Sequence, residues 1–178
     1  ILISNDINST IRILNDINRN DKFNIVLGNE GILTSDLINE IEVEKVKKLT
    51  VVSSAYDTNS LAFKEWEKYA NTAGLESKAS FLPNAYDAGF LIGLAIEKAG
   101  STDLEKIAKS LREVANSPGE KILPGQWEKA KALISSGESI DYIGASGKIE
   151  FDENGDLIGN YSINIITENK WKSVVIDQ

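Results

Sequence analysis

The clearest indication of the fold class is the run Phe23-Asn24-Ile25-Val26-Leu27-Gly28. It is apolar, partly β-branched and closed by a glycine, which predicts a strand. A helix is expected before it, because apolar residues recur at helical spacing at Ile7, Ile11, Leu14 and Ile17. A short helix that begins at 34–36 and a strand over 49–52 are expected to follow it. With a first strand over 1–4, this order implies a parallel sheet with right-handed crossovers, so the predicted fold class is α/β.

The remaining sequence predicts a helical middle and a β-rich tail. Helices are expected to begin at Asn59 or Ser60, at Pro83, at Ser101 or Thr102, and at Gln126. Asn8 or Ser9 is expected to cap the first helix. The tail predicts strands over 148–151, 161–167 and 171–176, with Ile163 and Ile165 on one face. Composition changes after Val52 and again after Asp156, as in a chain that leaves one sheet and later returns to it.

Composition excludes several kinds of function. The 178 residues hold 19 basic and 27 acidic side chains, a net charge of −8, so a nucleic-acid or anionic-membrane surface is not expected. The sequence has no His and no Cys, which excludes Ser-His-Asp and thiol catalysis and His- or Cys-ligated metals. No cofactor is predicted. No signal peptide and no apolar run of ~18 residues is visible. The sequence has no Met and opens on an apolar run, which predicts a piece of a longer chain.

Two motifs that suggest ligand binding are better explained as turns. The run Asp152-Glu153-Asn154-Gly155-Asp156 is acidic, but a calcium loop counted from Asp152 would need Gly at the sixth position and Glu at the twelfth. Those positions hold Leu157 and Asn164, so a turn between strands is predicted. Gly144-Ala145-Ser146-Gly147 precedes a strand rather than a helix, which indicates a tight bend and not a phosphate loop.

Three residues are candidates for a binding site. Glu30 follows the strand 23–27 at its carboxyl end, where open parallel sheets bind ligands, and its carboxylate can hold an ammonium group. The alternative for Glu30 is a solvated loop acid. Asp6 ends the first predicted strand and carries the same two interpretations. Tyr86 lies near the start of a helix, where core packing is the alternative to a contact with a ligand.

Two segments resemble one protein family. The first is Asn84-Ala85-Tyr86-Asp87-Ala88-Gly89-Phe90 with the helix that continues to Gly100, and the second runs from Tyr142 to Asp156. Together with Gly28-Asn29-Glu30-Gly31, they resemble the type I periplasmic solute-binding proteins of ABC importers. Within these the similarity is to the branched-chain (leucine/isoleucine/valine-type) amino-acid binding proteins. The resemblance covers essentially the whole chain, as the carboxyl-terminal half of such a protein.

The resemblance implies a domain organisation. It places residues 1–53 in the second lobe, 54–156 in the first lobe and 157–178 in the second lobe again. Each lobe would be a doubly wound parallel-sheet unit, present only in part, with crossover strands near 53–57 and 151–157. We therefore expect the chain to associate with a missing amino-terminal half or with an oligomer partner, because half-lobes expose sheet edges and apolar faces.

The resemblance also implies a function without catalysis. The chain would capture an amino acid or similar zwitterion by lobe closure, outside the cytoplasm, and deliver it to an ABC permease. Glu30 matches the family acid that pairs with the ligand ammonium, and Tyr86 matches a Tyr that lines the cleft. Asp6 stands where many relatives carry an aromatic residue, which leaves side-chain specificity open. The alternatives are a ligand-sensing domain of a receptor or regulator and, on the pair of Asp6 and Glu30, an α/β enzyme.

Overall fold

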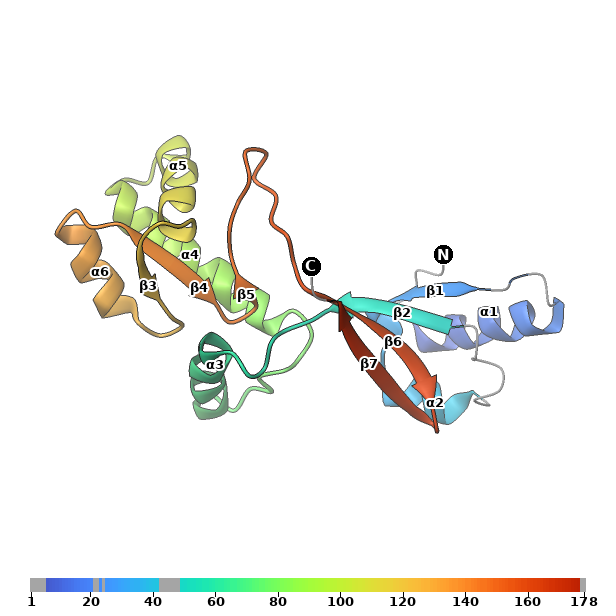
Figure 1. The fold of residues 1–178 in the computed structure, drawn as a ribbon. Helices are drawn as coiled ribbons and strands as arrows, with labels where there is room; N and C mark the ends of the chain where they lie inside the picture. Colours follow the sequence, from blue (N-terminus) through green and yellow to red (C-terminus); the bar gives the residue numbers. More distant parts are fainter. Residues whose placement is uncertain (1–5, 21–22, 24, 42–48, 177–178) are drawn as a thin grey trace. The chain divides into compact units, whose positions relative to one another are not determined.

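A computed structural model describes residues 6–20, 23, 25–41 and 49–176 of the chain. The chain divides into two compact units. Unit 1 comprises Ile1–Ala55 and Asn160–Gln178, and unit 2 comprises Tyr56–Gly159. Each unit has a sheet and helices of its own (Figure 1). The strand expected over 1–4 lies outside the described residues, and the assignment of the chain to two lobes stays a prediction.

Unit 1 is built on a four-stranded mixed sheet. Its strands are β1 (Val26–Asn29), β2 (Leu49–Ser54), β6 (Tyr161–Thr167) and β7 (Lys170–Ile176), in the order β1-β2-β6-β7. The pair β1–β2 is parallel, as the β-α-β pattern predicts, whereas β6 pairs antiparallel with both β2 and β7. The helices are α1 (Ile7–Asn20) and α2 (Ser35–Glu40), with the 3₁₀ turn η1 (Glu30–Ile32) after β1.

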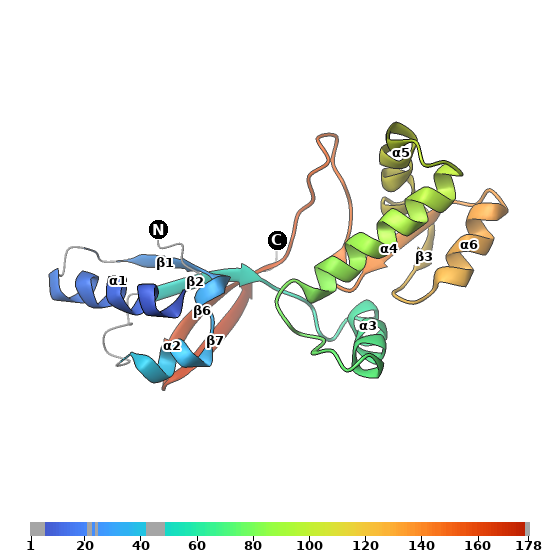
Figure 2. The same cartoon turned by 180° about the vertical axis from the view of Figure 1, so that it is seen from behind.

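Both helices of unit 1 cover the same face of the sheet. They lie behind the strands in Figure 1 and in front of them in Figure 2. The core between helices and sheet consists of seven buried apolar residues, Leu14, Val26, Ile32, Leu37, Ile41, Leu49 and Val51. The indole N–H of Trp171 on β7 donates to the carbonyl of Thr34 at 2.9 Å, which ties the tail to the turn before α2.

The capping residues of unit 1 are predicted in part. The Thr34 hydroxyl accepts from the backbone N–H of Leu37, which confirms the start of α2. The cap of α1 was expected at Asn8 or Ser9, and that expectation is wrong. The carboxylate of Asp6 accepts from the N–H of Ser9 at 2.8 Å, so Asp6 is the capping residue, two positions before Asn8 and three before Ser9.

Strand β6 turns its polar residues inward. Ser162 and Asn164 are buried on the face that the helices cover, whereas Ile163 and Ile165 lie on the other face, each 37% exposed. The Asn164 side chain donates to the carbonyl of Val51 at 3.0 Å and to the hydroxyl of Ser53 at 3.0 Å. Its own carbonyl accepts from Ser173 at 2.5 Å, so the buried amide is satisfied. The predicted placement of Ile163 and Ile165 on one face is confirmed, but that face lies away from α1 and α2, whereas Ile166 lies on the covered face and packs against the core.

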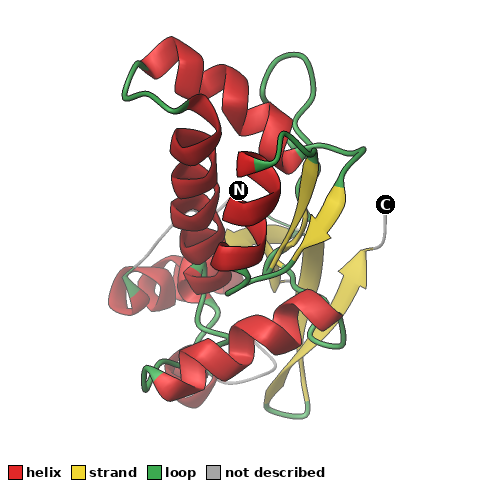
Figure 3. Cartoon of the chain, turned by 90° about the vertical axis from the view of Figure 1, so that its left-hand side faces the viewer, coloured by secondary structure: helices red, strands yellow, loops and turns green. Residues whose placement is uncertain are grey.

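Unit 2 combines four helices with a small sheet. The helices are α3 (Leu61–Thr72), α4 (Leu82–Ala99), α5 (Leu104–Ala115) and α6 (Trp127–Ser135). The sheet has the order β3-β4-β5, formed by β3 (Glu120–Ile122), β4 (Ile140–Gly144) and β5 (Gly147–Lys148). Strands β3 and β4 are parallel, and β4 and β5 are antiparallel. Figure 3 shows the helices of the chain in red and its strands in yellow.

In unit 2, two of the predicted helix starts are confirmed and one is shifted. The Ser60 hydroxyl caps α3 by accepting from the N–H of Phe63, and Pro83 lies in the first turn of α4. The cap of α5 is Asp103, whose carboxylate accepts from Lys106, and not Ser101 or Thr102. The loop expected between Pro118 and Pro124 contains the short strand β3.

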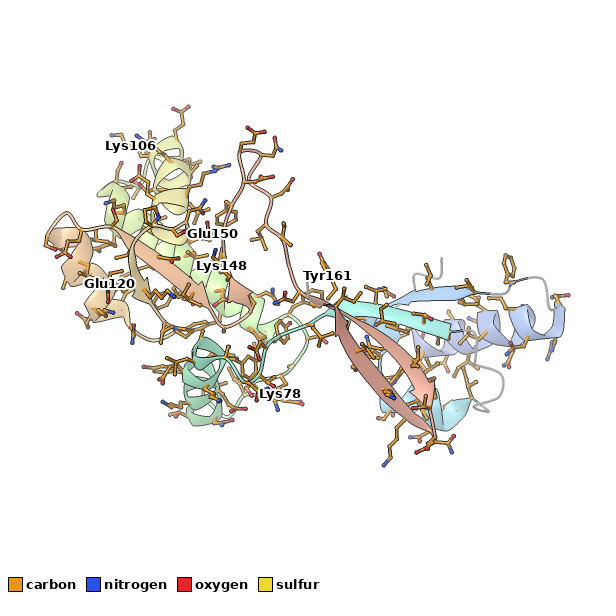
Figure 4. The ribbon with its side chains drawn as sticks, viewed as in Figure 1. Lys78, Lys106, Glu120, Lys148, Glu150 and Tyr161 are labelled. Atoms are coloured by element: carbon orange, nitrogen blue, oxygen red, sulfur yellow. The ribbon has the colours of Figure 1, made fainter. Side chains whose placement is uncertain are left out.

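The strand predicted over 148–151 is shorter than expected. Beyond Lys148 the backbone leaves the sheet, because the Asn116 side chain takes both hydrogen-bonding groups of Phe151, at 2.7 and 2.9 Å. Glu150 accepts from the Ser117 hydroxyl at 2.7 Å and pairs with Lys148 at 3.0 Å; both members of the ion pair are labelled in Figure 4. These side-chain contacts replace the strand bonds that the apolar pattern predicted.

Candidate functional site

Glu30 lies where two neighbouring parallel strands end. It opens η1 directly after β1, and its partner Ser54 is the last residue of β2. One carboxylate oxygen of Glu30, Oε2, accepts from the backbone N–H of Ser54 at 3.1 Å and from the Ser54 hydroxyl at 3.0 Å. The carboxyl ends of parallel strands therefore hold this acid in a fixed orientation, at the kind of edge where α/β sheets bind ligands.

The second carboxylate oxygen of Glu30 is not used. Oε1 is buried and accepts no hydrogen bond within the described part of the chain. A buried acceptor without a donor costs about 1–3 kcal/mol, so this atom favours an additional donor. An ammonium or guanidinium group would supply a charge-assisted hydrogen bond at this oxygen.

Side chains pack closely against Gly28, two residues before Glu30. A Cβ added at Gly28 would lie 2.5 Å from Cδ1 of Ile32 and 3.3 Å from Cγ2 of Val51. Ile32 is fully buried and anchors η1 in the core of unit 1. Gly28, the first glycine of the Gly-x-Glu-Gly motif, thus leaves room for the Ile32 and Val51 side chains next to the turn that carries Glu30.

Asp6 is engaged with its own helix. Besides the bond from Ser9 to its carboxylate, its backbone carbonyl accepts from the N–H and the hydroxyl of Thr10, both at 3.0 Å. Hydrogen bonds from the Ser9 side chain and then from the Ser9 backbone hold the pKa of Asp6 below its usual value. The Asp6 side chain is exposed, and it caps α1.

Tyr86 lies on α4 in unit 2, within a row of aromatic rings. Its ring centre is 4.7 Å from that of Trp66 and 5.7 Å from that of Phe90. Its hydroxyl accepts from the backbone N–H of Gly125 at 2.8 Å, and burial raises the pKa of the phenol. The side chain is half-buried, so core packing accounts for one side of the ring. Asp6 and Glu30 belong to unit 1, whereas Tyr86 belongs to unit 2.

The residue next to Tyr86 is a buried acid that the sequence analysis did not single out. Asp87 is 2% exposed and its two oxygens accept four hydrogen bonds. The donors are the Tyr142 hydroxyl at 2.7 Å, the Ala145 N–H at 2.8 Å, and the N–H and hydroxyl of Ser146 at 2.7 and 2.6 Å. Burial raises the pKa of Asp87, against the lowering effect of the bonds from Ser146.

Asp87 explains the glycine-rich segment. Residues 145–146 form the turn between β4 and β5, which confirms the predicted bend. A Cβ at Gly144 would lie 2.5 Å from Oδ2 of Asp87, so only glycine lets the turn reach this carboxylate. The sequence contains one indication that Asp87 is buried. It lies four residues before Leu91, so the two side chains share the buried side of α4.

The structure gives no sign of metal chemistry or of a membrane span in the part that it describes. Among these residues, no three acidic side chains gather in a way that could hold a metal ion. None of the helices described is both long and apolar enough to cross a bilayer.

Residues 12–169 match the model of a family described as the receptor family ligand binding region. A leucine binding protein, LivK from Thermotoga maritima, is similar in structure, with a TM-score of 0.61 and 27% identity over 96% of this chain. LivJ from Streptococcus pneumoniae, a branched-chain amino acid transporter substrate binding protein solved with isoleucine, has a TM-score of 0.56 and 15% identity over 98% of this chain.

A curated relative comes from a signalling system. The substrate-binding protein BasB of a chemotactic signal transduction system in Halobacterium salinarum is 30% identical over 88 residues, which is 49% of this chain and 21% of BasB. The chain also spans only 42% of LivK and 43% of LivJ. It therefore corresponds to less than half the length of each of these relatives.

Proposed function

Because this chain belongs to the family described as the receptor family ligand binding region, we propose that it binds an amino acid or a similar small zwitterion. Its fold is that of the type I periplasmic binding proteins. We further propose that Glu30 receives the ammonium group of the ligand. The observation that carries this proposal is the Glu30 carboxylate, with one oxygen fixed by Ser54 and the other buried without a donor in the described chain.

The proposed pairing follows from the electrostatics of the site. A carboxylate whose orientation is already fixed loses little freedom when a cation arrives, so more of the interaction energy contributes to affinity. Amino acids and small amines carry the N–H donors that Oε1 needs. Tyr86 and Asp6 are proposed as further ligand contacts, Tyr86 through its ring and Asp6 as a second acidic group.

The proposed role is capture and delivery without catalysis. We propose that the protein works outside the cytoplasm and passes its ligand to an ABC permease. The solved relative LivJ supports this, since its description names it a transporter substrate binding protein. A sensing role in a receptor or signalling system is the second candidate, and the chemotactic system of BasB favours it.

Calorimetry of Glu30→Gln tests the ligand assignment. The complete reading-frame product that contains residues 1–178 would be titrated with a panel of amino acids, next to the same product with Glu30→Gln. We expect at least tenfold weaker binding of the best ligand by the variant, since a charge-assisted bond becomes a neutral one. Glu40→Gln is the matched control, because Glu40 is an exposed acid of the same unit. Equal affinities for Glu30→Gln and the unchanged protein would refute the ammonium role.

A further inference from the structure

Asp141 on β4 is a buried acid that the proposed function does not use. It is 5% exposed, and its oxygen Oδ1 is buried and accepts no hydrogen bond within the described part of the chain. Asp87, another buried acid of unit 2, has four donors instead. An ionised carboxylate that is buried without a donor is far costlier than a neutral acid, so this site favours a proton on Asp141.

The charged side chains that act on Asp141 come from the sheet of unit 2. Lys121 on β3 is its partner in the parallel register, Lys148 lies on β5, and Glu150 follows two residues later. Lys121 is exposed, and Lys148 forms its ion pair with Glu150 at 3.0 Å rather than with Asp141. Burial first, and then the negative charge of Glu150, raise the pKa of Asp141, whereas Lys148 and Lys121 lower it. The two lysines therefore reduce the cost of a charge on Asp141 without removing it.

The charged groups of the neighbouring helices are engaged elsewhere. On α6, Lys129 pairs with Glu120 at 2.7 Å. Helices α4 and α5 pack on the other side of β4, where Tyr142 lies in their core, and the acid of α4, Asp87, is bound to Tyr142 there. Helix α3 packs against the turn after β4. Within the described chain, the helices thus leave the charge of Asp141 to its neighbours in the sheet.

Glu150 holds the backbone that leaves the sheet after β5. Its oxygen Oε1 accepts from the Ser117 hydroxyl at 2.7 Å and from the Ser117 N–H at 3.3 Å, besides the ion pair with Lys148. The bonds from the Ser117 side chain and then from Lys148 lower the pKa of Glu150, so Glu150 is the ionised acid of the two. The residues after it, 151–159, lead to β6 of unit 1. Lys148 and Glu150 are both labelled in Figure 4.

We propose that Asp141 and Glu150 form a proton-responsive pair, in which ionisation of Asp141 releases the backbone that Glu150 holds. With a proton on Asp141, the pair carries one negative charge, which Lys148 and Ser117 compensate. Loss of the proton adds a second negative charge, which repels Glu150 and competes for Lys148. The start of the segment 151–159 is therefore held more firmly at acidic pH than at higher pH. The inference concerns unit 2 and is independent of Glu30 and of the ligand.

Asp141→Asn tests the pair, because an amide has the shape of the neutral acid and cannot ionise. The variant and the unchanged protein, each as the complete reading-frame product, would be compared by amide exchange at Ser117, whose N–H donates to Glu150. A raised folded pKa means that stability is lost as the pH rises through it, so we expect the protection factor of this amide in the unchanged protein to fall about tenfold between about pH 4 and about pH 8. It should change far less in Asp141→Asn. Asp156→Asn, at an exposed acid of the same unit, is the matched control and should behave as the unchanged protein does. The same pH dependence in Asp141→Asn as in the unchanged protein would overturn the proposal.

A double-mutant cycle with Glu150→Gln tests whether Glu150 is the partner of Asp141. At about pH 8, Asp141→Asn should lower the unfolding constant of unit 2 about tenfold in urea, and much less where Glu150→Gln is already present. Additive effects of the two substitutions would overturn the pairing. An increase of the unfolding constant in Asp141→Asn would also overturn the proposal, and would assign to ionised Asp141 a donor outside residues 1–178. If Asp141→Asn gives no cooperative melt, a carbon NMR titration of Asp141 in the unchanged protein decides: a pKa above the ordinary value for Asp supports the pair, and one at or below that value overturns it.

Discussion

Glu30 in unit 1 and Asp87 in unit 2 are two acids that the fold uses differently. Asp87 is buried, and both of its oxygens are occupied by donors from Tyr142 and from the turn at 145–146. Glu30 uses one oxygen and leaves the other buried without a donor in the described chain. A carboxylate with every acceptor site satisfied stabilises the fold, whereas one with a spare oxygen can still bind something else.

The largest effect is expected from Asp87→Ala. The substitution leaves buried donors of Tyr142, Ala145 and Ser146 without an acceptor, and each such group costs about 1–3 kcal/mol. We expect the free energy of unfolding of unit 2 to fall by about 3 kcal/mol or more, measured by urea denaturation. Asp156→Ala, at an exposed acid of the same unit, is the control and should change stability by less than about 0.5 kcal/mol. A similar loss of stability in both variants would show that Asp87 contributes no more to the fold than an exposed acid does.

Ser54→Ala tests whether the Ser54 hydroxyl orients the Glu30 carboxylate for binding. It removes one of the two bonds that orient the carboxylate and leaves the backbone N–H of Ser54 in place. We expect ligand affinity, by calorimetry, to fall by about fivefold, which corresponds to roughly 1 kcal/mol. Ser54→Thr keeps the hydroxyl and should restore most of the affinity. If Thr and Ala weaken binding equally, Ser54 does not orient Glu30.

Tyr86→Phe measures the stability contributed by a single hydrogen bond, for comparison with the four hydrogen bonds that Asp87→Ala removes. The variant keeps the ring between Trp66 and Phe90 and loses the hydroxyl that accepts from Gly125. We expect unit 2 to lose about 1 kcal/mol of stability, and the amide of Gly125 to exchange faster with solvent. Unchanged exchange at Gly125 would show that the hydroxyl does not hold this loop.

The smallest effect is expected at the third acid, Asp6. Its pKa is lowered in the folded chain by bonds from Ser9, so its contribution to stability is present above the unfolded pKa. The contribution is lost as the pH falls through the lower, folded pKa. Asp6→Asn keeps a capping oxygen without a charge, so exchange of the Ser9 amide should lose this acid dependence but stay slower than in Asp6→Ala. Equal exchange in Asn and Ala variants would argue against the cap.

The sequence predicts those features that depend on neighbours along the chain. Thr34 and Ser60 cap the helices that follow them, and the strand over 161–167 has the predicted bounds. The position of Glu30 after a strand is likewise predicted, but the bounds of that strand are not: it was expected over 23–27 with Gly28 as its end, whereas β1 runs from Val26 through Gly28 to Asn29. Features that depend on distant partners are missed. The bond from Ser54 to Glu30 comes from the parallel register of β1 and β2, which no local pattern contains.

The missed features of unit 2 have the same origin. Asp87 accepts hydrogen bonds from residues more than fifty positions away, so the sequence of α4 alone does not predict its role. Strand β3 is three residues long and is exposed except at Ile122, which gives it no apolar alternation to detect. The inward turn of Asn164 depends on Ser53, Val51 and Ser173, which belong to two other strands.

The division of the chain also has a consequence for synthesis on the ribosome. Unit 2 is continuous, from Tyr56 to Gly159, and is inserted into unit 1, whose sheet joins β2 to β6. The bond between the hydroxyls of Ser53 and Ser162 spans 109 positions of sequence. All residues of unit 2 are therefore synthesised before the tail, whereas the edge of β2 that pairs with β6 has no partner strand until the tail is made.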